Sequence, residues 1–186
     1  IFSLKRYRDA TAKRKSIRAY TDNQVDQQDL EKITEAGRWA PNAGEFQMSV
    51  IRKPELLQKI NDRTHKAMLN SGNEFLQQRA SLPGYQPLYG APLLILLSGP
   101  ADAPYSAINT AVAAENMLLQ ATELGLGSCF LASTRLGING EENRDLAEEA
   151  GIPENYTLQC AVIIGYTADE NKFSPGERTR KGSVIY

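Results

Sequence analysis

The amino-acid sequence predicts a single α+β domain spanning residues 1–186. The chain is 41% hydrophobic and 23% charged, which is ordinary for a globular protein able to bury roughly 70% of its unfolded surface. Two apolar runs, 92–97 and 158–166, predict buried strands, whereas apolar residues recur at helical spacing over 26–40. These helices and strands alternate without the even rhythm of parallel crossover units, which favours α+β.

The N-terminal half predicts three helices and one strand. A short helix is expected over 3–13 and an amphipathic helix over 26–40, which Pro41 ends because proline cannot donate to the helical ladder. The run 46–51 is a strand candidate. Pro54 suits the first turn of a further helix.

The C-terminal half is organised around a long helix. The continuous apolar run 92–97 is typical of a strand covered on both faces. The helix expected over 106–124 is apolar nearly all round, so it should be central or lie in an interface, and Gly125 is its expected C-cap. The remaining expectations are a helix end and flexible excursion at 70–90, a strand or tight loop at 125–131, a short helix at 141–150 and a polar, turn-rich tail from residue 172.

Charge is distributed unevenly along the chain. The formal net charge is −1, yet residues 1–18 contain seven Lys or Arg against Asp9 alone. A near-neutral total argues against a nucleic-acid partner, and the local excess favours an anion site. The two cysteines predict no disulfide framework, and the apolar runs are too short to span a bilayer. We therefore expect a soluble, cytoplasmic protein without a membrane partner.

The basic segment contains Arg14, Ser16 and Arg18 at alternate positions. If the segment is extended, these three side chains project from one face. Two planar guanidinium groups around a hydroxyl suit a phosphate or another oxyanion. The alternative is a solvated basic surface, which is what most charge runs are.

The sequence lacks the residue patterns of dinucleotide-binding, zinc-binding and cysteine-nucleophile sites. The Gly125-x-Gly127 pair has no third glycine and follows a helix, unlike a dinucleotide fingerprint. One histidine, His65, with scattered carboxylates argues against a zinc site. Cys129 faintly resembles the nucleophile region of papain-type proteases, but no histidine follows it. We expect Cys129 to be a buried structural thiol and His65 a solvent-facing helix residue, with no metal site.

Four elements in order resemble the FMN-dependent nitroreductase family over nearly the whole chain. They are the Arg14-x-Ser16-x-Arg18 segment, a helix ending in Ala-Pro before a small polar loop (40–44), a long helix running into Gly-Leu-Gly (125–127), and the late basic pair Arg178 and Arg180. Each motif alone is weak evidence for the family, but the four motifs in this order are fairly specific for it.

The resemblance implies a central, mostly antiparallel sheet flanked by helices in an intertwined homodimer, with FMN at the subunit interface. Arg14, Lys15, Ser16, Arg18, Arg178 and Arg180 would hold the phosphate and ribityl oxygens. Pro41, Asn42 and Ala43 would reach the partner's flavin, while the backbone of Leu131, Ala132 and Ser133 would lie near its ring. Gln47 matches a further flavin-contacting position.

The same resemblance implies an FMN oxidoreductase that takes hydride from NADH or NADPH and reduces nitroaromatic, quinone or similar acceptors in a ping-pong mechanism. The cofactor carries this chemistry, so no catalytic side chain is expected. One departure is that Glu45 replaces a common Asn and the Pro-Trp pair after Gln47 is absent. The alternatives are a specialised enzyme of the family, of the ene reductase or dehalogenase type, and a non-catalytic flavin carrier.

Overall fold

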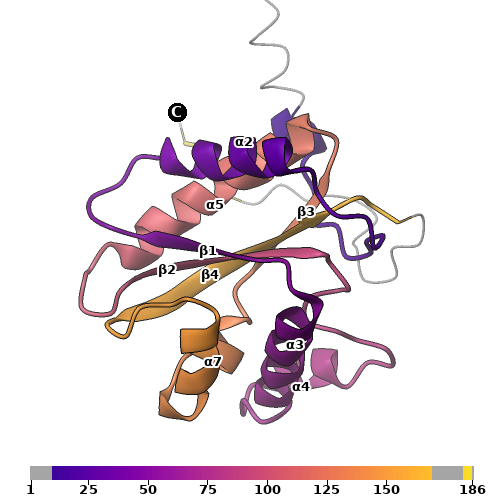
Figure 1. Cartoon of the computed structure of the whole chain (residues 1–186), viewed down its shortest axis with the longest axis vertical. Helices are drawn as coiled ribbons and strands as arrows, with labels where there is room; N and C mark the ends of the chain where they lie inside the picture. Colours follow the sequence, from indigo (N-terminus) through magenta and orange to yellow (C-terminus); the bar gives the residue numbers. More distant parts are fainter. Residues whose placement is uncertain (1–9, 169–181, 186) are drawn as a thin grey trace, which may run out of the picture.

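A four-stranded antiparallel sheet lies between two layers of helices (Figure 1). In this computed structural model the described residues are 10–168 and 182–185. The strands occur in the order β1-β2-β4-β3, with every pair antiparallel. Their bounds are β1 Gln47–Ile51, β2 Leu93–Pro100, β3 Gly127–Leu131 and β4 Tyr156–Gly165. The predicted α+β class and antiparallel sheet are confirmed.

Strand β2 separates two hydrophobic cores. Its side chains alternate between the faces, so Leu93, Ile95 and Leu97 join one core whereas Leu94 and Leu96 join the other. All five side chains have no exposed surface. This two-sided burial explains why the run is continuously apolar rather than alternating.

Helices α2 and α5 cover the first face of the sheet. Helix α2 spans Gln27–Arg38, and the Asp26 side chain caps it by accepting a bond from the Gln28 N–H at 2.8 Å. Helix α5 spans Ser106–Glu123 and contacts β2, β3 and β4. After it, Gly125 adopts a left-handed φ of 77°, as the predicted helix end requires.

The second face is covered by α3 and by shorter helices from the later chain. Their bounds are α3 Pro54–Leu69, α4 Glu74–Ala80, α6 Arg135–Ile138, the 3₁₀ helix η1 Glu141–Asn143 and α7 Arg144–Glu149. The prediction of a flexible excursion at 70–90 is wrong for 74–80, which form α4 on the surface of α3. Asn73 caps this helix by accepting from the Leu76 N–H at 3.1 Å.

The chain before α2 runs along the outer edge of β3. Residues 10–13 end a helix, and the rest of the helix expected at 3–13 lies outside the described residues. Ser16 forms a parallel bridge with Ser128, and the Ile17 N–H donates to the Ser128 carbonyl at 2.9 Å. Tyr20 then bridges Thr167 beyond the end of β4. No helix among the described residues is long and apolar enough to cross a membrane.

Gly127 permits this close approach. A Cβ at Gly127 would lie 2.6 Å from the Thr167 Oγ1 and 3.0 Å from a methyl group of Ile17. Both neighbours belong to the segments that meet at the β3 edge. A side chain at this position would push them apart.

We expect Gly127→Ala to lower the free energy of unfolding by about 1–3 kcal/mol, because the added methyl group overpacks this contact. Urea unfolding of Gly127→Ala, Thr167→Ala and the double variant measures the effect. The double variant should regain part of the loss, since it removes the nearest atom. Equal stability of Gly127→Ala and the parent would contradict the contact.

Candidate functional site

The edge pairing with β3 fixes the orientation of the basic segment. Arg14, Ser16 and Arg18 are all partly buried, Lys15 is exposed, and Ile17 is buried in the protein. Ser16 and Ile17 pair with Ser128 of β3, whereas the Arg14 N–H still closes a helical turn onto the Ala10 carbonyl at 2.8 Å. Arg14, Ser16 and Arg18 all act on the Cys129 thiol, so two guanidinium groups and a hydroxyl lie next to β3.

The buried Cys129 thiol is surrounded by these groups. Burial raises the pKa of Cys129, while the charges of Arg18, Arg79 and Arg14 and a hydrogen bond with Ser16 lower it. Burial has the larger effect, so the thiol stays neutral at pH 7. Cys129 is 1% exposed, which confirms the expected buried thiol.

Two buried polar atoms beside this cluster have no hydrogen-bond partner among the described residues. They are the Arg14 Nε and the Ser128 Oγ. The Arg14 Nε lies 3.5 Å from the Glu115 Oε1, an ion-pair distance without hydrogen-bond geometry. Because an unsatisfied buried polar atom costs about 1–3 kcal/mol, these two atoms are candidates to be satisfied by an oxyanion or an ordered water.

Arg79 is a further cation at this edge, and no motif in the sequence indicates it. It lies in the last turn of α4, and its Nη2 donates to the Tyr89 hydroxyl at 2.9 Å. Its guanidinium carbon lies 5.4 Å from the Tyr85 ring centre, and that of Arg18 lies 5.8 Å from the Tyr89 ring centre. Only the folding of 70–92 back onto the sheet reveals this grouping.

The polar loop after α2 lies near the start of β1, at the opposite edge of the sheet (Figure 1). Pro41, Asn42 and Ala43 are exposed. The Ala43 N–H donates to the Oδ1 of Asn109, a buried residue of α5, at 2.9 Å. Gly44 has a φ of 136°, a backbone conformation that residues with a side chain rarely adopt. Asn109 therefore positions the loop, and no sequence motif pointed to it.

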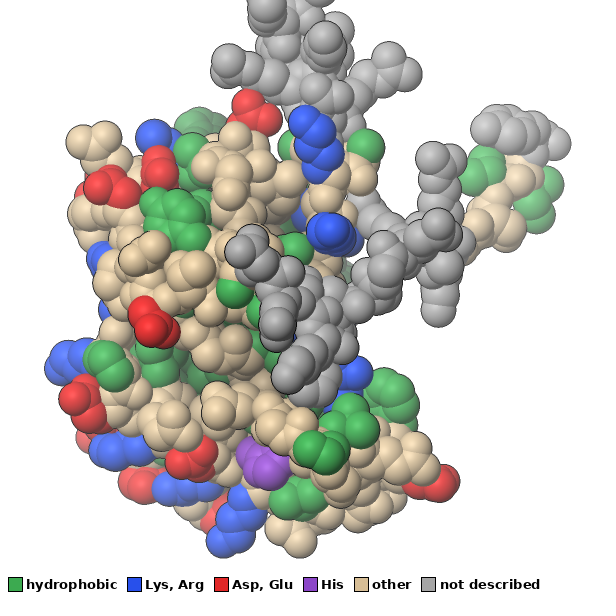
Figure 2. Space-filling view, turned by 90° about the vertical axis from the view of Figure 1, so that its right-hand side faces the viewer, with side chains coloured by type: hydrophobic (Ala, Val, Ile, Leu, Met, Phe, Trp, Pro, Cys, Tyr) green, Lys and Arg blue, Asp and Glu red, His purple; other side chains and the backbone are tan. Residues whose placement is uncertain are grey.

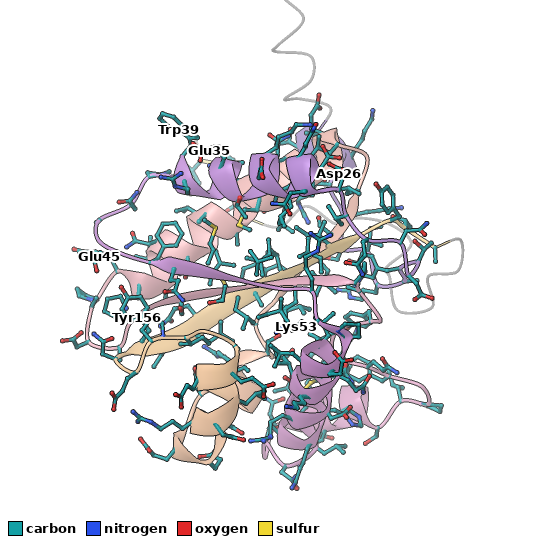
Figure 3. All side chains as sticks on the ribbon, viewed as in Figure 1. Asp26, Glu35, Trp39, Glu45, Lys53 and Tyr156 are labelled. Atoms are coloured by element: carbon teal, nitrogen blue, oxygen red, sulfur yellow. The ribbon has the colours of Figure 1, made fainter. Side chains whose placement is uncertain are left out.

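Glu45 and Gln47, which follow this loop, bond within the chain. The Tyr156 hydroxyl donates to Glu45 Oε2 at 3.2 Å, and both residues lie beside the start of β4 (Figure 3). Partial burial and the Glu45 carboxylate raise the pKa of Tyr156. The Gln47 Nε2 donates to the Gly151 carbonyl and the Ser49 Oγ, so this nitrogen already has partners. Trp39 is 79% exposed beside the loop and projects from the end of α2 (Figure 3).

The turn after β3 offers backbone donors. Leu131 is buried at the end of the strand, whereas Ala132 is exposed and Ser133 is partly buried. Within the described residues, the N–H groups of Ala132 and Ser133 have no protein acceptor. Arg178 and Arg180 lie outside the described residues.

His65 reaches the surface, as expected, but it is partly buried because it also contacts α4. Its Nε2 lies 2.7 Å from the Ala80 carbonyl, and its ring lies 6.2 Å from that of Tyr85. It faces α4 because that helix packs on α3. Figure 2 shows the histidine at the surface of the face that lies to the right in Figure 1, with Lys and Arg side chains also on this face.

Comparison with known proteins identifies the family. The nitroreductase family model matches residues 11–166. The chain belongs to the nitroreductase family. An Archaeoglobus fulgidus protein named "Putative NADH dehydrogenase/NAD(P)H nitroreductase" is 32% identical over 170 residues, which cover 86% of this chain and 84% of that protein. The predicted family is therefore confirmed.

Solved structures of family members have the same fold. A Bacteroides fragilis nitroreductase with bound FMN superposes with a TM-score of 0.80 at 28% identity, covering 96% of this chain and 94% of that one. A Desulfitobacterium hafniense nitroreductase with bound FMN superposes with a TM-score of 0.86 over 97% of both chains. At 22% identity, the second supports the fold alone.

We expect Asn109→Ala to free the polar loop, because the Ala43 N–H loses its acceptor. Hydrogen exchange at the Ala43 amide should accelerate, and the free energy of unfolding should fall by about 0.5–1.5 kcal/mol. Asn116→Ala is the matched control, since Asn116 lies on the same helix but donates to the Ala36 carbonyl of α2 at 3.1 Å. Equal exchange at Ala43 in the two variants would show that Asn109 does not hold the loop.

Proposed function

We propose that the protein is a homodimeric FMN oxidoreductase that takes hydride from NADH or NADPH. The electrons pass to a nitroaromatic, quinone or similar acceptor at the same site, in a ping-pong mechanism. The observation that carries the proposal is the Arg14-Ser16-Arg18 cluster along β3, where the Arg14 Nε and the Ser128 Oγ have no hydrogen-bond partner among the described residues. The FMN bound to the Bacteroides fragilis relative supports the choice of anion.

The described residues fit the phosphate of FMN. Arg14 and Arg18 supply planar donors and Ser16 supplies a hydroxyl, and Ser16 is paired with Ser128 across the two backbone segments. Charge-assisted hydrogen bonds from such donors contribute roughly 1.5–3 kcal/mol each. Lys15 is exposed and adds to the local positive field, and Arg178 and Arg180 are proposed as further phosphate ligands.

The position of the polar loop favours a site shared by two subunits. Residues 14–18 lie outside β3, and residues 41–43 precede β1 at the other edge of the sheet. Four inter-strand spacings of about 4.8 Å place these edges roughly 19 Å apart. A second copy of the chain that brings its loop to the β3 edge would complete the site. The exposed Trp39 side chain next to the loop would become buried in that contact.

The chain's own contribution is to bind and orient. Bound FMN supplies the hydride-accepting and electron-donating chemistry. The N–H groups of Ala132 and Ser133 are free to donate toward the ring, and Leu131 helps to exclude water from that side of β3. Neither the neutral Cys129 thiol nor His65 is needed as an acid or base.

The phosphate site is tested with Arg18→Ala. Losing one charge-assisted contact should weaken FMN binding by about tenfold to a hundredfold. Lys53→Ala removes a positive charge at the start of α3 (Figure 3), just after β1 at the sheet edge opposite β3, and should leave the affinity unchanged. Flavin fluorescence titration measures both. An unchanged FMN affinity in Arg18→Ala would mean that residues 14–18 are an ordinary solvated basic surface.

Steady-state oxidation of NADH and NADPH separates an enzyme from a flavin carrier. The FMN-loaded parent should oxidise one or both nucleotides faster when menadione or a nitrofuran is added. Bound flavin without acceptor-dependent turnover would contradict the oxidoreductase and favour the carrier.

Subunit complementation tests the shared site. Arg18→Ala damages the phosphate cluster, and Asn42→Glu places a carboxylate in the exposed loop. Each homodimer should bind FMN poorly. A mixed dimer should regain one intact site, formed by the cluster of one chain and the loop of the other, and hold about one FMN per dimer. Mixed dimers without recovered binding would mean that each site belongs to a single chain.

A further inference from the structure

We propose that Arg79 is a specificity-determining residue that binds the carboxylate of an anionic electron acceptor beside the flavin. The inference rests on the proposed function and names the class of acceptor: nitroaromatics or quinones that carry a carboxylate. Arg79 comes from the segment 70–92, in which the sequence showed no motif.

Arg79 is held in place by two aromatic side chains. The Tyr89 hydroxyl accepts from its Nη2 at 2.9 Å, and the Tyr85 ring lies under its guanidinium carbon at 5.4 Å. The two rings meet edge to face, with centres 5.6 Å apart and an angle of 88° between their planes. A guanidinium held in this way is pre-organised, so little conformational entropy is lost when it binds a ligand.

The positive charge of Arg79 has no anionic partner among the described residues. No described carboxylate lies within 4 Å of it, and its contacts are the phenol side chains of Tyr85 and Tyr89. Burial, followed by the hydrogen bond with Tyr89, raises the pKa of Tyr85, so this ring does not become a phenolate. By contrast, Arg63 on the neighbouring helix pairs with Asp145 at 3.3 Å. An arginine held by neutral groups is available to an external anion.

The location of Arg79 points to the substrate rather than the FMN phosphate. Arg18 of the phosphate cluster lies over the Tyr89 ring, whereas Arg79 bonds to the hydroxyl of the same residue, so Tyr89 separates the two cations. Tyr85 and Tyr89 also pack with Leu136 of α6, which begins just after Ser133. Arg79 is therefore displaced from the phosphate cluster toward the turn proposed to face the flavin ring.

Backbone strain at Tyr89 accompanies this arrangement. Tyr89 has a φ of 51°, and no other non-glycine residue among those described has a positive φ. For a bulky residue this conformation is rare and costs of order 1–3 kcal/mol. The strain places the Tyr89 side chain between Arg18 and Arg79.

The planar fork of an arginine matches a carboxylate through two parallel hydrogen bonds. The guanidinium of Arg79 has five N–H groups, so donors remain for a ligand after its hydrogen bonds with Tyr89 and Tyr85. Each charge-assisted bond contributes roughly 1.5–3 kcal/mol, which corresponds to about tenfold to a hundredfold in affinity.

The test compares acceptors of similar size, one with a carboxylate and one with a neutral hydroxymethyl group, using FMN-loaded Arg79→Gln, Arg79→Lys and Tyr89→Phe. The kcat/KM for 4-nitrobenzoate is divided by that for 4-nitrobenzyl alcohol. A second readout is the Kd of benzoate relative to benzyl alcohol, from the flavin difference spectrum. Arg79→Gln should lower both preferences for the anion by at least tenfold. Arg79→Lys should retain part of them, and Tyr89→Phe should lower them less than Arg79→Gln does.

Arg63→Gln is the matched control, because it removes an arginine that already has a carboxylate partner, and both preferences should stay unchanged. The proposal is overturned if Arg79→Gln and Tyr89→Phe keep the parental preferences. It is also overturned if Arg79→Gln loses FMN affinity while keeping its preference for the anion, since Arg79 would then serve the cofactor. Turnover of 4-nitrobenzyl alcohol by the parent tests the proposed oxidoreductase function separately. If the parent turns over this neutral acceptor, failure of the Arg79 proposal leaves the proposed function intact.

Discussion

The pairing of residues 16–20 with the outer edge of the sheet determines where the functional groups lie. Ile17 donates to the Ser128 carbonyl, and Ala19 and Thr21 exchange backbone hydrogen bonds with Ala168 and Tyr166 at 2.9–3.0 Å. Each such bond contributes only about 0.5–1.5 kcal/mol, but together they fix the register of the segment. This register sends Ile17 inward and brings Ser16 and Arg18 beside Cys129, and Arg14 joins them from the preceding helical turn.

The sheet keeps the two groups of candidate flavin contacts apart. The β1-β2-β4-β3 order places the basic cluster at one edge and the polar loop before the strand at the other. The side chains of β2 join two separate cores, one on each face, and this burial holds the strand in the middle of the sheet. Under the proposed function, each edge of the sheet would supply half of a cofactor site. This favours a dimer in which two complete sites form between subunits.

Much of the fold could be predicted because its signals are local. Asp26 caps α2, Pro54 opens α3, and the apolar run at 92–97 becomes the central strand. The helix α4 escaped prediction because its sequence is polar and its packing on α3 decides its conformation. Asn73 was the available signal, as an asparagine suited to an N-cap.

The candidate site was predictable only in part. Arg14, Ser16 and Arg18 lie close in sequence, so their spacing indicated a shared face. Arg79 and Asn109 gain their positions from contacts with residues distant in the chain, such as Asn109 with Ala43. Arg79 is brought near Arg18 by Tyr89, a neighbour that no periodicity reveals.

Sedimentation velocity of the FMN-loaded protein, recorded at the flavin absorbance near 450 nm, tests the central claim most directly. The interfacial site predicts that all bound flavin sediments with a species of twice the 20.5 kDa chain mass. On dilution, flavin should be released as that species dissociates. Flavin that sediments with the 20.5 kDa chain, or a protein that binds no FMN, would contradict the account.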